Sequence, residues 1–165
     1  MSLESTGVPS AGQLSAVHPP EHMRKQRAYA VFECFERIPC DPCYWCCPQG
    51  AVRAFADIND LPSVDYTKCT GCGICVAHCP GLAVFVVDES HSSSHGLLKL
   101  PHEFRPLPVP GELVDLLDRE GTRRGKGRVV RVVGKARGDT PVVWVEVESH
   151  LLASVRAIRV GGRTP

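Results

Sequence analysis

The spacing of hydrophobic residues divides the chain into two parts. From about residue 109 onward, short β-branched runs bounded by Gly and Pro recur, in GELVDLLDREG, GRVVRVVG and TPVVWVEVE. The following stretch, SHLLASVRAIRV, suits one helical turn and a last strand. Short strands joined by tight turns predict a small β-barrel or an antiparallel β lobe over residues 109–165.

The first part is less regular. YAVFEC, which ends at Cys34, alternates and is rich in β-formers, so it predicts a strand. Residues 1–26 are rich in Pro, Ser and Gly and are expected to form a disordered tail. Residues 91–108 open with Ser, His and Gly and are expected to form an exposed linker. The segment 27–90 between them is the predicted first domain, which gives an α+β protein.

Composition narrows the functional classes. Hydrophobic residues make up 43% of the 165 positions and charged residues 22%, which is typical of a globular protein. A net charge of +1 provides no general attraction to nucleic acid or to a membrane surface. No apolar run approaches the roughly 20 residues of a membrane span, and the N-terminus lacks the apolar region of a secretory signal. We therefore expect a cytoplasmic protein with no nucleic-acid partner and no membrane span.

The nine cysteines change this picture. All of them lie between Cys34 and Cys79. Because the cytosol keeps thiols reduced, such clustering predicts metal ligands or redox centres rather than disulfides.

The stretch CTGCGICVAHCP carries the most specific signal. Its cysteines follow the C-x2-C-x2-C-x3-C-P spacing of a bacterial-type [4Fe-4S] site, in which the fourth cysteine ligates the other cluster of a two-cluster protein. Gly71 and Gly73 permit positive φ and close backbone approach, which lets N–H groups point at the sulfurs. Pro80 ends the loop.

A second cysteine set supports the crossed arrangement. Alignment of Cys47-Pro48 with Cys79-Pro80 brings two further cysteine pairs into register, and a three-residue insertion in FERIP restores the remaining one. The chain thus has an internal repeat of about 32 residues, which predicts a ferredoxin-like dicluster module with a pseudo-twofold repeat. The predicted ligands are Cys34, Cys40, Cys43 and Cys79 for cluster I, and Cys69, Cys72, Cys75 and Cys47 for cluster II.

Cys46 is left over and is interpreted as a small packing residue, with exchange of roles with Cys47 as the alternative. Apolar residues near both sets are expected to keep water from the iron: Phe32, Phe35, Ile38, Tyr44, Trp45, Ile74, Val76, Leu82 and Phe85.

Two alternatives come from other functional classes. Cys40, Cys43, Cys69 and Cys72 could instead form a four-thiolate zinc ribbon, but that reading leaves four cysteines and both Cys-Pro endings unexplained. Basic residues also gather in the second part, where a solvated hairpin surface, an acidic-partner docking patch and nucleic-acid binding are all open readings: Arg119, Arg123, Arg124, Lys126, Arg128, Arg131, Lys135 and Arg137.

The two cysteine sets, the connection DINDLPSVDY and the β-rich tail from FRPLPVPGELV together resemble a particular family. It comprises the 2[4Fe-4S] ferredoxin-like small subunits of FAD-dependent amino-acid or amine dehydrogenases of the proline/hydroxyproline dehydrogenase kind. The resemblance implies two [4Fe-4S] clusters on the eight cysteines named above. It also implies FAD-dependent dehydrogenase subunits as partners, with a [2Fe-2S] subunit in some complexes.

The expected function is therefore electron transfer without catalysis by this chain. The alternatives are a free-standing ferredoxin shuttle and, from another class, a zinc- or cluster-dependent nucleic-acid-binding module.

Overall fold

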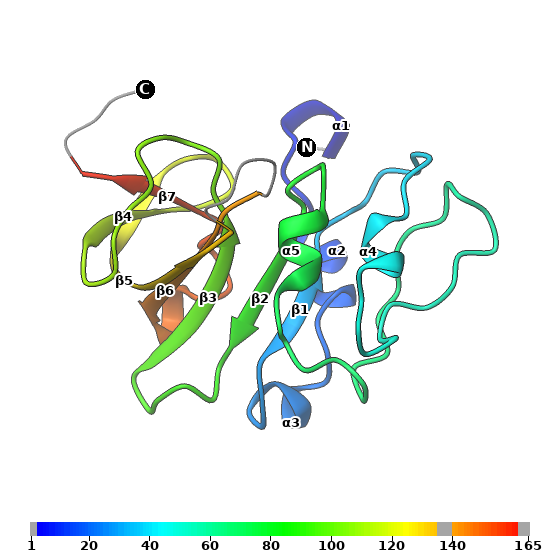
Figure 1. Ribbon diagram of the computed structural model, residues 1–165, viewed down its shortest axis with the longest axis horizontal. Helices are drawn as coiled ribbons and strands as arrows, with labels where there is room; N and C mark the ends of the chain where they lie inside the picture. Colours follow the sequence, from blue (N-terminus) through cyan, green and yellow to red (C-terminus); the bar gives the residue numbers. More distant parts are fainter. Residues whose placement is uncertain (1–2, 135–139, 162–165) are drawn as a thin grey trace.

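The computed structural model describes residues 3–134 and 140–161. Seven strands form one antiparallel sheet in the order β1-β2-β3-β6-β5-β4-β7 (Figure 1). The strands are β1 (Tyr29–Phe32), β2 (Val84–Asp88), β3 (His95–Pro101), β4 (Leu113–Leu117), β5 (Arg123–Val133), β6 (Val142–Glu148) and β7 (Ala157–Val160). The α+β class is confirmed, and the second part of the chain contributes an antiparallel sheet.

The strands predicted in the second part are present. GELVDLLDREG contains β4, and its last residues form the turn into β5. Asp118 builds this turn, because its buried carboxylate accepts hydrogen bonds from the N–H groups of Glu120 and Thr122 at 3.0 and 2.9 Å. The predicted helical turn is the 3-10 helix η1 (Ser149–Leu151), and β7 follows it.

Strand β3 is where the structure differs most from the sequence prediction. It lies inside the segment 91–108, which was expected to be a linker, and it joins β2 to β6 in the middle of the sheet. The Ser- and His-rich start of this segment is a turn, but Leu97, Leu98 and Leu100 that follow are buried. One sheet therefore runs across the boundary predicted between the two parts.

Strands β1 and β2 have two buried faces. Tyr29, Val31, Phe85 and Val87 pack into the core that the remaining strands form. The alternate positions, including Ala30, Phe32, Val84 and Val86, pack against the cysteine loops. Burial on both faces explains why these strands are continuous apolar runs.

The N-terminal segment contains short helices where a disordered tail was predicted. They are α1 (Leu3–Thr6), α2 (Ala11–Ala16) and α3 (Glu21–Arg24). Ser10 and Gln13 form a capping box at the start of α2. Val17 packs against the main core, its carbonyl accepts a hydrogen bond from the Tyr66 hydroxyl, and Arg24 pairs with Glu89 at 3.4 Å. Composition averaged over the segment does not reveal these few anchoring residues.

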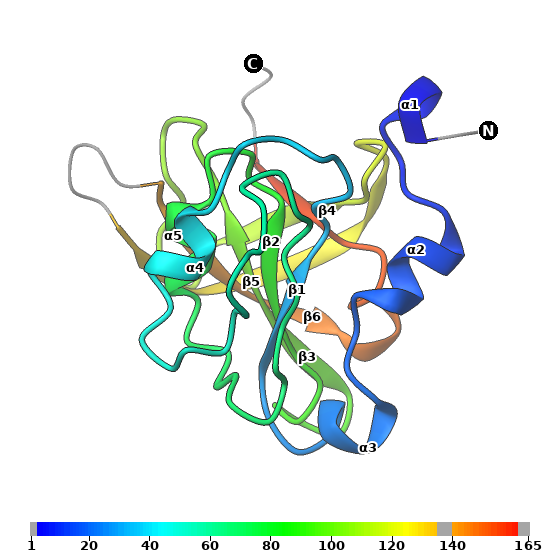
Figure 2. The same ribbon diagram turned by 90° about the vertical axis from the view of Figure 1, so that its right-hand side faces the viewer.

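Two short helices lie within the cysteine-containing region. Helix α4 (Pro42–Trp45) belongs to the first cysteine set and α5 (Ile74–His78) to the second, and the two are in contact (Figure 2). None of the helices in the described part of the chain is long and apolar enough to cross a membrane.

Candidate iron–sulfur site

The backbone brings the two cysteine loops together by a crossed pairing. Strand β1, which precedes the first set, pairs with β2, which follows the second set. Val52, which follows the first set, forms an isolated antiparallel bridge with Val64, which precedes the second set. The Cys-Pro end of each loop is thereby carried toward the start of the other loop.

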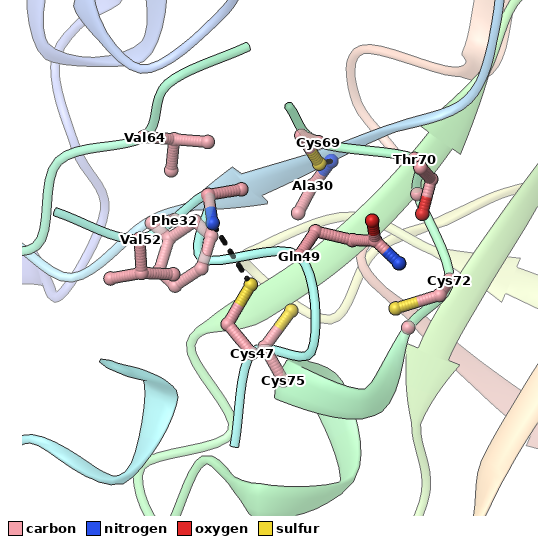
Figure 3. Close-up of a pocket in the computed structure, with 13 residues that line it drawn as sticks. Ala30, Phe32, Cys47, Gln49, Val52, Val64, Cys69, Thr70, Cys72 and Cys75 are labelled. Carbon is pink, nitrogen blue, oxygen red and sulfur yellow. Dashed lines mark hydrogen bonds between the residues drawn. The ribbon is translucent and has the colours of Figure 1, made fainter. Parts of the chain in front are cut away.

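One pocket is lined by Cys47, Cys69, Cys72 and Cys75. Figure 3 shows Cys47 and Cys75 on one side of this pocket and Cys69 on the other. Phe32, Ala51, Val52 and Val64 complete its apolar wall. Three thiols come from one loop and the fourth comes from the other.

A second pocket is lined by Cys34, Cys40, Cys43 and Cys79. Three thiols again come from one loop and the fourth from the other. Phe32 lines this pocket as well, so the two pockets share a wall. The eight cysteines predicted as ligands thus line two pockets, four in each.

Two glycines shape the second loop. Gly71 has φ of +63°, and a Cβ on it would lie 2.5 Å from the Ala28 Cβ and 2.6 Å from its carbonyl carbon. Gly73 has φ of +89°. Both glycines therefore have the positive φ expected for them, and Gly71 also has the close backbone approach.

Backbone N–H groups point at three of the sulfurs. Ala51 N lies 3.3 Å from Cys47 Sγ (Figure 3), and Ala83 N lies 3.4 Å from Cys79 Sγ. A third donor, Ala30 N, lies 3.4 Å from Cys69 Sγ. Such donors stabilise negative charge on sulfur, which is what a thiolate ligand of iron requires.

The surroundings shift the thiol pKa values in opposite directions. Burial raises the pKa of Cys43 to about 12 and also raises that of Cys75. At Cys47 burial acts in the same direction, but the N–H groups of residues 49–52 outweigh it and lower the pKa. Iron must therefore displace protons from the buried thiols when it binds.

The zinc-ribbon alternative does not fit this geometry. Cys40 and Cys43 line one pocket, whereas Cys69 and Cys72 line the other. Across residues 3–134 and 140–161, no three His, Cys, Asp or Glu side chains are arranged to hold a metal ion. That finding applies to the two cysteine quartets as well, so it is the grouping of the thiols in two pockets that disfavours the zinc ribbon.

Cys46 lines neither of these pockets. Its thiol lies 3.6 Å from the Cys43 carbonyl oxygen, and its side chain packs against the core beneath the loops. Its role as a packing residue stays a prediction.

The predicted apolar shield is only partly correct. Phe32 and Val76 are buried beside the cysteines. Ile38, Trp45 and Ile74 are exposed by 46%, 76% and 39%, so they do not seal the pockets within this chain. Phe85 faces the other core, because adjacent residues of β2 point to opposite faces.

A buried ion network, which sequence reasoning missed, ties the first cysteine loop to the far strands. Glu33 directly precedes Cys34, and its carboxylate accepts two hydrogen bonds from Arg119, at 2.7 and 2.6 Å, and one from Arg156 at 2.7 Å. Burial opposes ionisation of Glu33, but the two guanidinium groups hold its pKa below the ordinary value. Nothing in the local sequence indicates these partners, which lie 86 and 123 positions away.

Three of the six basic residues between positions 119 and 131 form ion pairs within the chain. Arg119 binds Glu33, Arg123 pairs with Asp115, and Arg124 pairs with Asp118. Lys135 and Arg137 lie outside the described residues. This pairing favours the hairpin-surface interpretation over a free basic patch.

One protein-family model matches part of this chain. Residues 62–85 match the family described as 4Fe-4S binding domain, so the chain contains a ferredoxin-type 4Fe-4S domain. This match covers the second cysteine set but not the first. No solved structure matches the chain.

Curated relatives cover different parts of the chain. Protein Pixie of Drosophila melanogaster is 30% identical over 58% of this chain and 17% of its own length. Pyruvate synthase subunit PorD of Methanocaldococcus jannaschii is 40% identical over 32% of this chain and 58% of PorD. Thiosulfate reductase electron transfer subunit PhsB of Salmonella typhi is 41% identical over 28% of this chain and 26% of PhsB. The chain therefore spans less than two thirds of each relative.

Proposed function

We propose that this chain is an electron-transfer subunit that carries two [4Fe-4S] clusters and relays electrons for an oxidoreductase complex. Cluster I would be held by Cys34, Cys40, Cys43 and Cys79. Cluster II would be held by Cys69, Cys72, Cys75 and Cys47. We also propose a ferredoxin-like pseudo-twofold repeat for the cysteine-containing region, and a cytoplasmic location, where thiols stay reduced.

The observation that carries this proposal is the crossed grouping of the thiols. Each pocket is lined by three cysteines of one loop and by the Cys-Pro cysteine of the other. Two-cluster ferredoxins distribute their ligands in this way. A site for one metal ion would not require the exchange.

Further support comes from matching local geometry. Ala51 N donates to Cys47 Sγ and Ala83 N donates to Cys79 Sγ, in each case from four residues further along the chain. Gly50 and Leu82, three residues after these cysteines, have φ of +57° and +52°. Such agreement is expected of two copies of one loop.

A bound [4Fe-4S] cluster supplies one-electron transfer, and the protein supplies ligation, orientation and burial. The cysteines hold the iron, and the N–H groups directed at sulfur stabilise its negative charge. Phe32 lines both pockets, so a short path connects the two sites. Cys72 is exposed, which gives cluster II an edge at which a partner can exchange electrons.

We propose FAD-dependent amino-acid or amine dehydrogenase subunits as the partners, with a [2Fe-2S] subunit in the same complex. The resemblance of the whole cysteine and β-rich arrangement supports this choice. Relatives named as subunits of pyruvate synthase and thiosulfate reductase support the broader role of an oxidoreductase subunit.

Anaerobic affinity purification from the native host tests the proposal, with iron, sulfide, zinc and flavin assayed in the same sample. We expect about eight irons and eight sulfides per chain, as two cubanes require, together with a flavoprotein that co-purifies. Eight irons without a companion would indicate a mobile ferredoxin. Zinc in place of iron would refute the electron-transfer role.

A further inference from the structure

We propose that Lys99 raises the reduction potential of the cluster held by Cys47, Cys69, Cys72 and Cys75. This inference rests on the proposed function. It assigns a tuning role to a residue of the β-sheet that lies outside both cysteine loops.

Lys99 is buried behind the second cysteine loop. It lies in the middle of β3, and only 7% of the residue is exposed. Its Nζ donates to the carbonyl oxygens of Gly71 at 2.6 Å and of Cys72 at 3.3 Å. Both carbonyls belong to the loop that supplies three of the four thiols, so the amine lies directly against the ligand loop.

The loop is also fitted to the apolar stem of this side chain. A Cβ on Gly73 would lie 3.2 Å from Lys99 Cδ. The glycine therefore leaves room for the lysine to reach the two carbonyls. Strand β3 supplies the lysine and the loop supplies the glycine that leaves room for it, so both elements contribute to this contact.

The contacts of Nζ suit a positively charged ammonium group. Two carbonyl oxygens accept its protons, and the face of the Trp144 ring lies 4.0 Å from it. Lys99 belongs to none of the ion pairs within the described ranges, and the carboxylate of Asp88 acts on it from a longer distance.

A buried cation beside a cluster favours the reduced state. Reduction adds one negative charge to the cluster, and in a medium of low effective dielectric a nearby positive charge stabilises that added charge. Both of the loop carbonyls that Lys99 contacts belong to the loop of Cys69, Cys72 and Cys75. The effect of Lys99 should therefore act mainly on one of the two clusters.

The test is an EPR-monitored redox titration of the purified full-length chain with its clusters. Lys99→Met removes the charge, Lys99→Gln removes the charge but keeps a donor, and Lys99→Arg keeps the charge. Lys126→Met is the matched control, because Lys126 is exposed on β5. Cys72→Ser, which perturbs the cluster in that pocket, assigns the two signals.

We expect Lys99→Met and Lys99→Gln to lower one midpoint potential, that of the cluster perturbed by Cys72→Ser. The reduced-to-oxidised ratio at fixed potential should fall about tenfold, which corresponds to about 59 mV for one electron. Lys99→Arg and Lys126→Met should stay close to the unaltered protein.

Three results would overturn the inference. One is an unchanged potential in iron-replete Lys99→Met and Lys99→Gln. Another is an equal fall of both midpoints. The third is loss of iron from all three Lys99 variants, which would assign the residue to building the loop. Absence of two clusters from the unaltered protein would instead refute the proposed function.

Discussion

The two cysteine loops are alike at their ends and different at their beginnings. At the ends, Cys47 and Cys79 receive matching N–H donors and are followed by residues with positive φ. At the beginnings, the second loop has two residues between Cys69 and Cys72, whereas the first loop has five residues between Cys34 and Cys40. The shared geometry is thus concentrated where a thiol must reach into the other loop's pocket.

The rest of the fold supports the two loops in different ways. The longer first loop is joined to the far strands by Glu33, Arg119 and Arg156, and its outer residue Ile38 is exposed. The tighter second loop is held from behind by Lys99 and packs on Ala28 through Gly71. Residues outside the cysteine-containing region therefore anchor both loops, from strand β3 for the second loop and from segments next to β4 and β7 for the first.

Replacement of Cys79 should have the largest effect on the two cysteine loops. Cys79 belongs to the second motif but lines the first pocket. We expect Cys79→Ser to lose the cluster of Cys34, Cys40 and Cys43, and with it about four of the eight irons. Iron analysis and EPR of the reduced protein measure this. If the cluster of Cys69, Cys72 and Cys75 were lost instead, the crossed assignment would be wrong.

The Glu33 network should give the next largest effect. Glu33→Gln leaves the guanidinium groups of Arg119 and Arg156 buried without their counter-charge, so we expect a loss of about 3–5 kcal/mol in the free energy of unfolding. Anaerobic urea denaturation followed by circular dichroism measures it. Glu21→Gln, which breaks the exposed Lys25–Glu21 pair, is the control and should change stability far less.

This prediction has a defined pH dependence. Because the pKa of Glu33 is lowered in the folded chain, its stabilisation is present above the ordinary value of 4.5 and is lost as the pH falls through the lowered value. The difference between the unaltered protein and Glu33→Gln should therefore be largest near neutrality and shrink in acid. A difference that grew in acid would contradict the ion network as the cause.

The local sequence pattern predicts those elements whose formation depends on residues close together in the chain. β1, β4 and β6 follow from alternation and turn residues, and the cysteine groups follow from spacing. Strand β3 was not predicted, because its segment begins with Ser and His residues that are typical of a loop, and the buried leucines come only after them. Lys99 and Arg156 could not be assigned from sequence, because their partners are distant in the chain and nothing near them indicates a carboxylate or a loop carbonyl.

Glycine substitution in the two loops should give a smaller and unequal effect. Gly71→Ala combines positive φ with a Cβ that would lie 2.5 Å from Ala28, so we expect a loss of about 2–4 kcal/mol. Gly50→Ala also meets positive φ but has nothing within 4 Å of the new Cβ, so about 1 kcal/mol is expected. Denaturation of both variants under the same conditions measures the contrast. Equal losses would show that close packing on Ala28 is not what fixes the second loop.

Cys46 should give the smallest effect of all. It neighbours Cys47, but its thiol lies 3.6 Å from the Cys43 carbonyl and lines neither cysteine pocket. Cys46→Ala removes one partly buried sulfur without removing a ligand, so we expect both clusters to be retained at full iron content. Cys47→Ser is the matched comparison and should lose the cluster of Cys69, Cys72 and Cys75. If Cys46→Ala lost iron and Cys47→Ser retained it, Cys46 would be the crossed ligand in place of Cys47, because only one of the two neighbours can serve in that role.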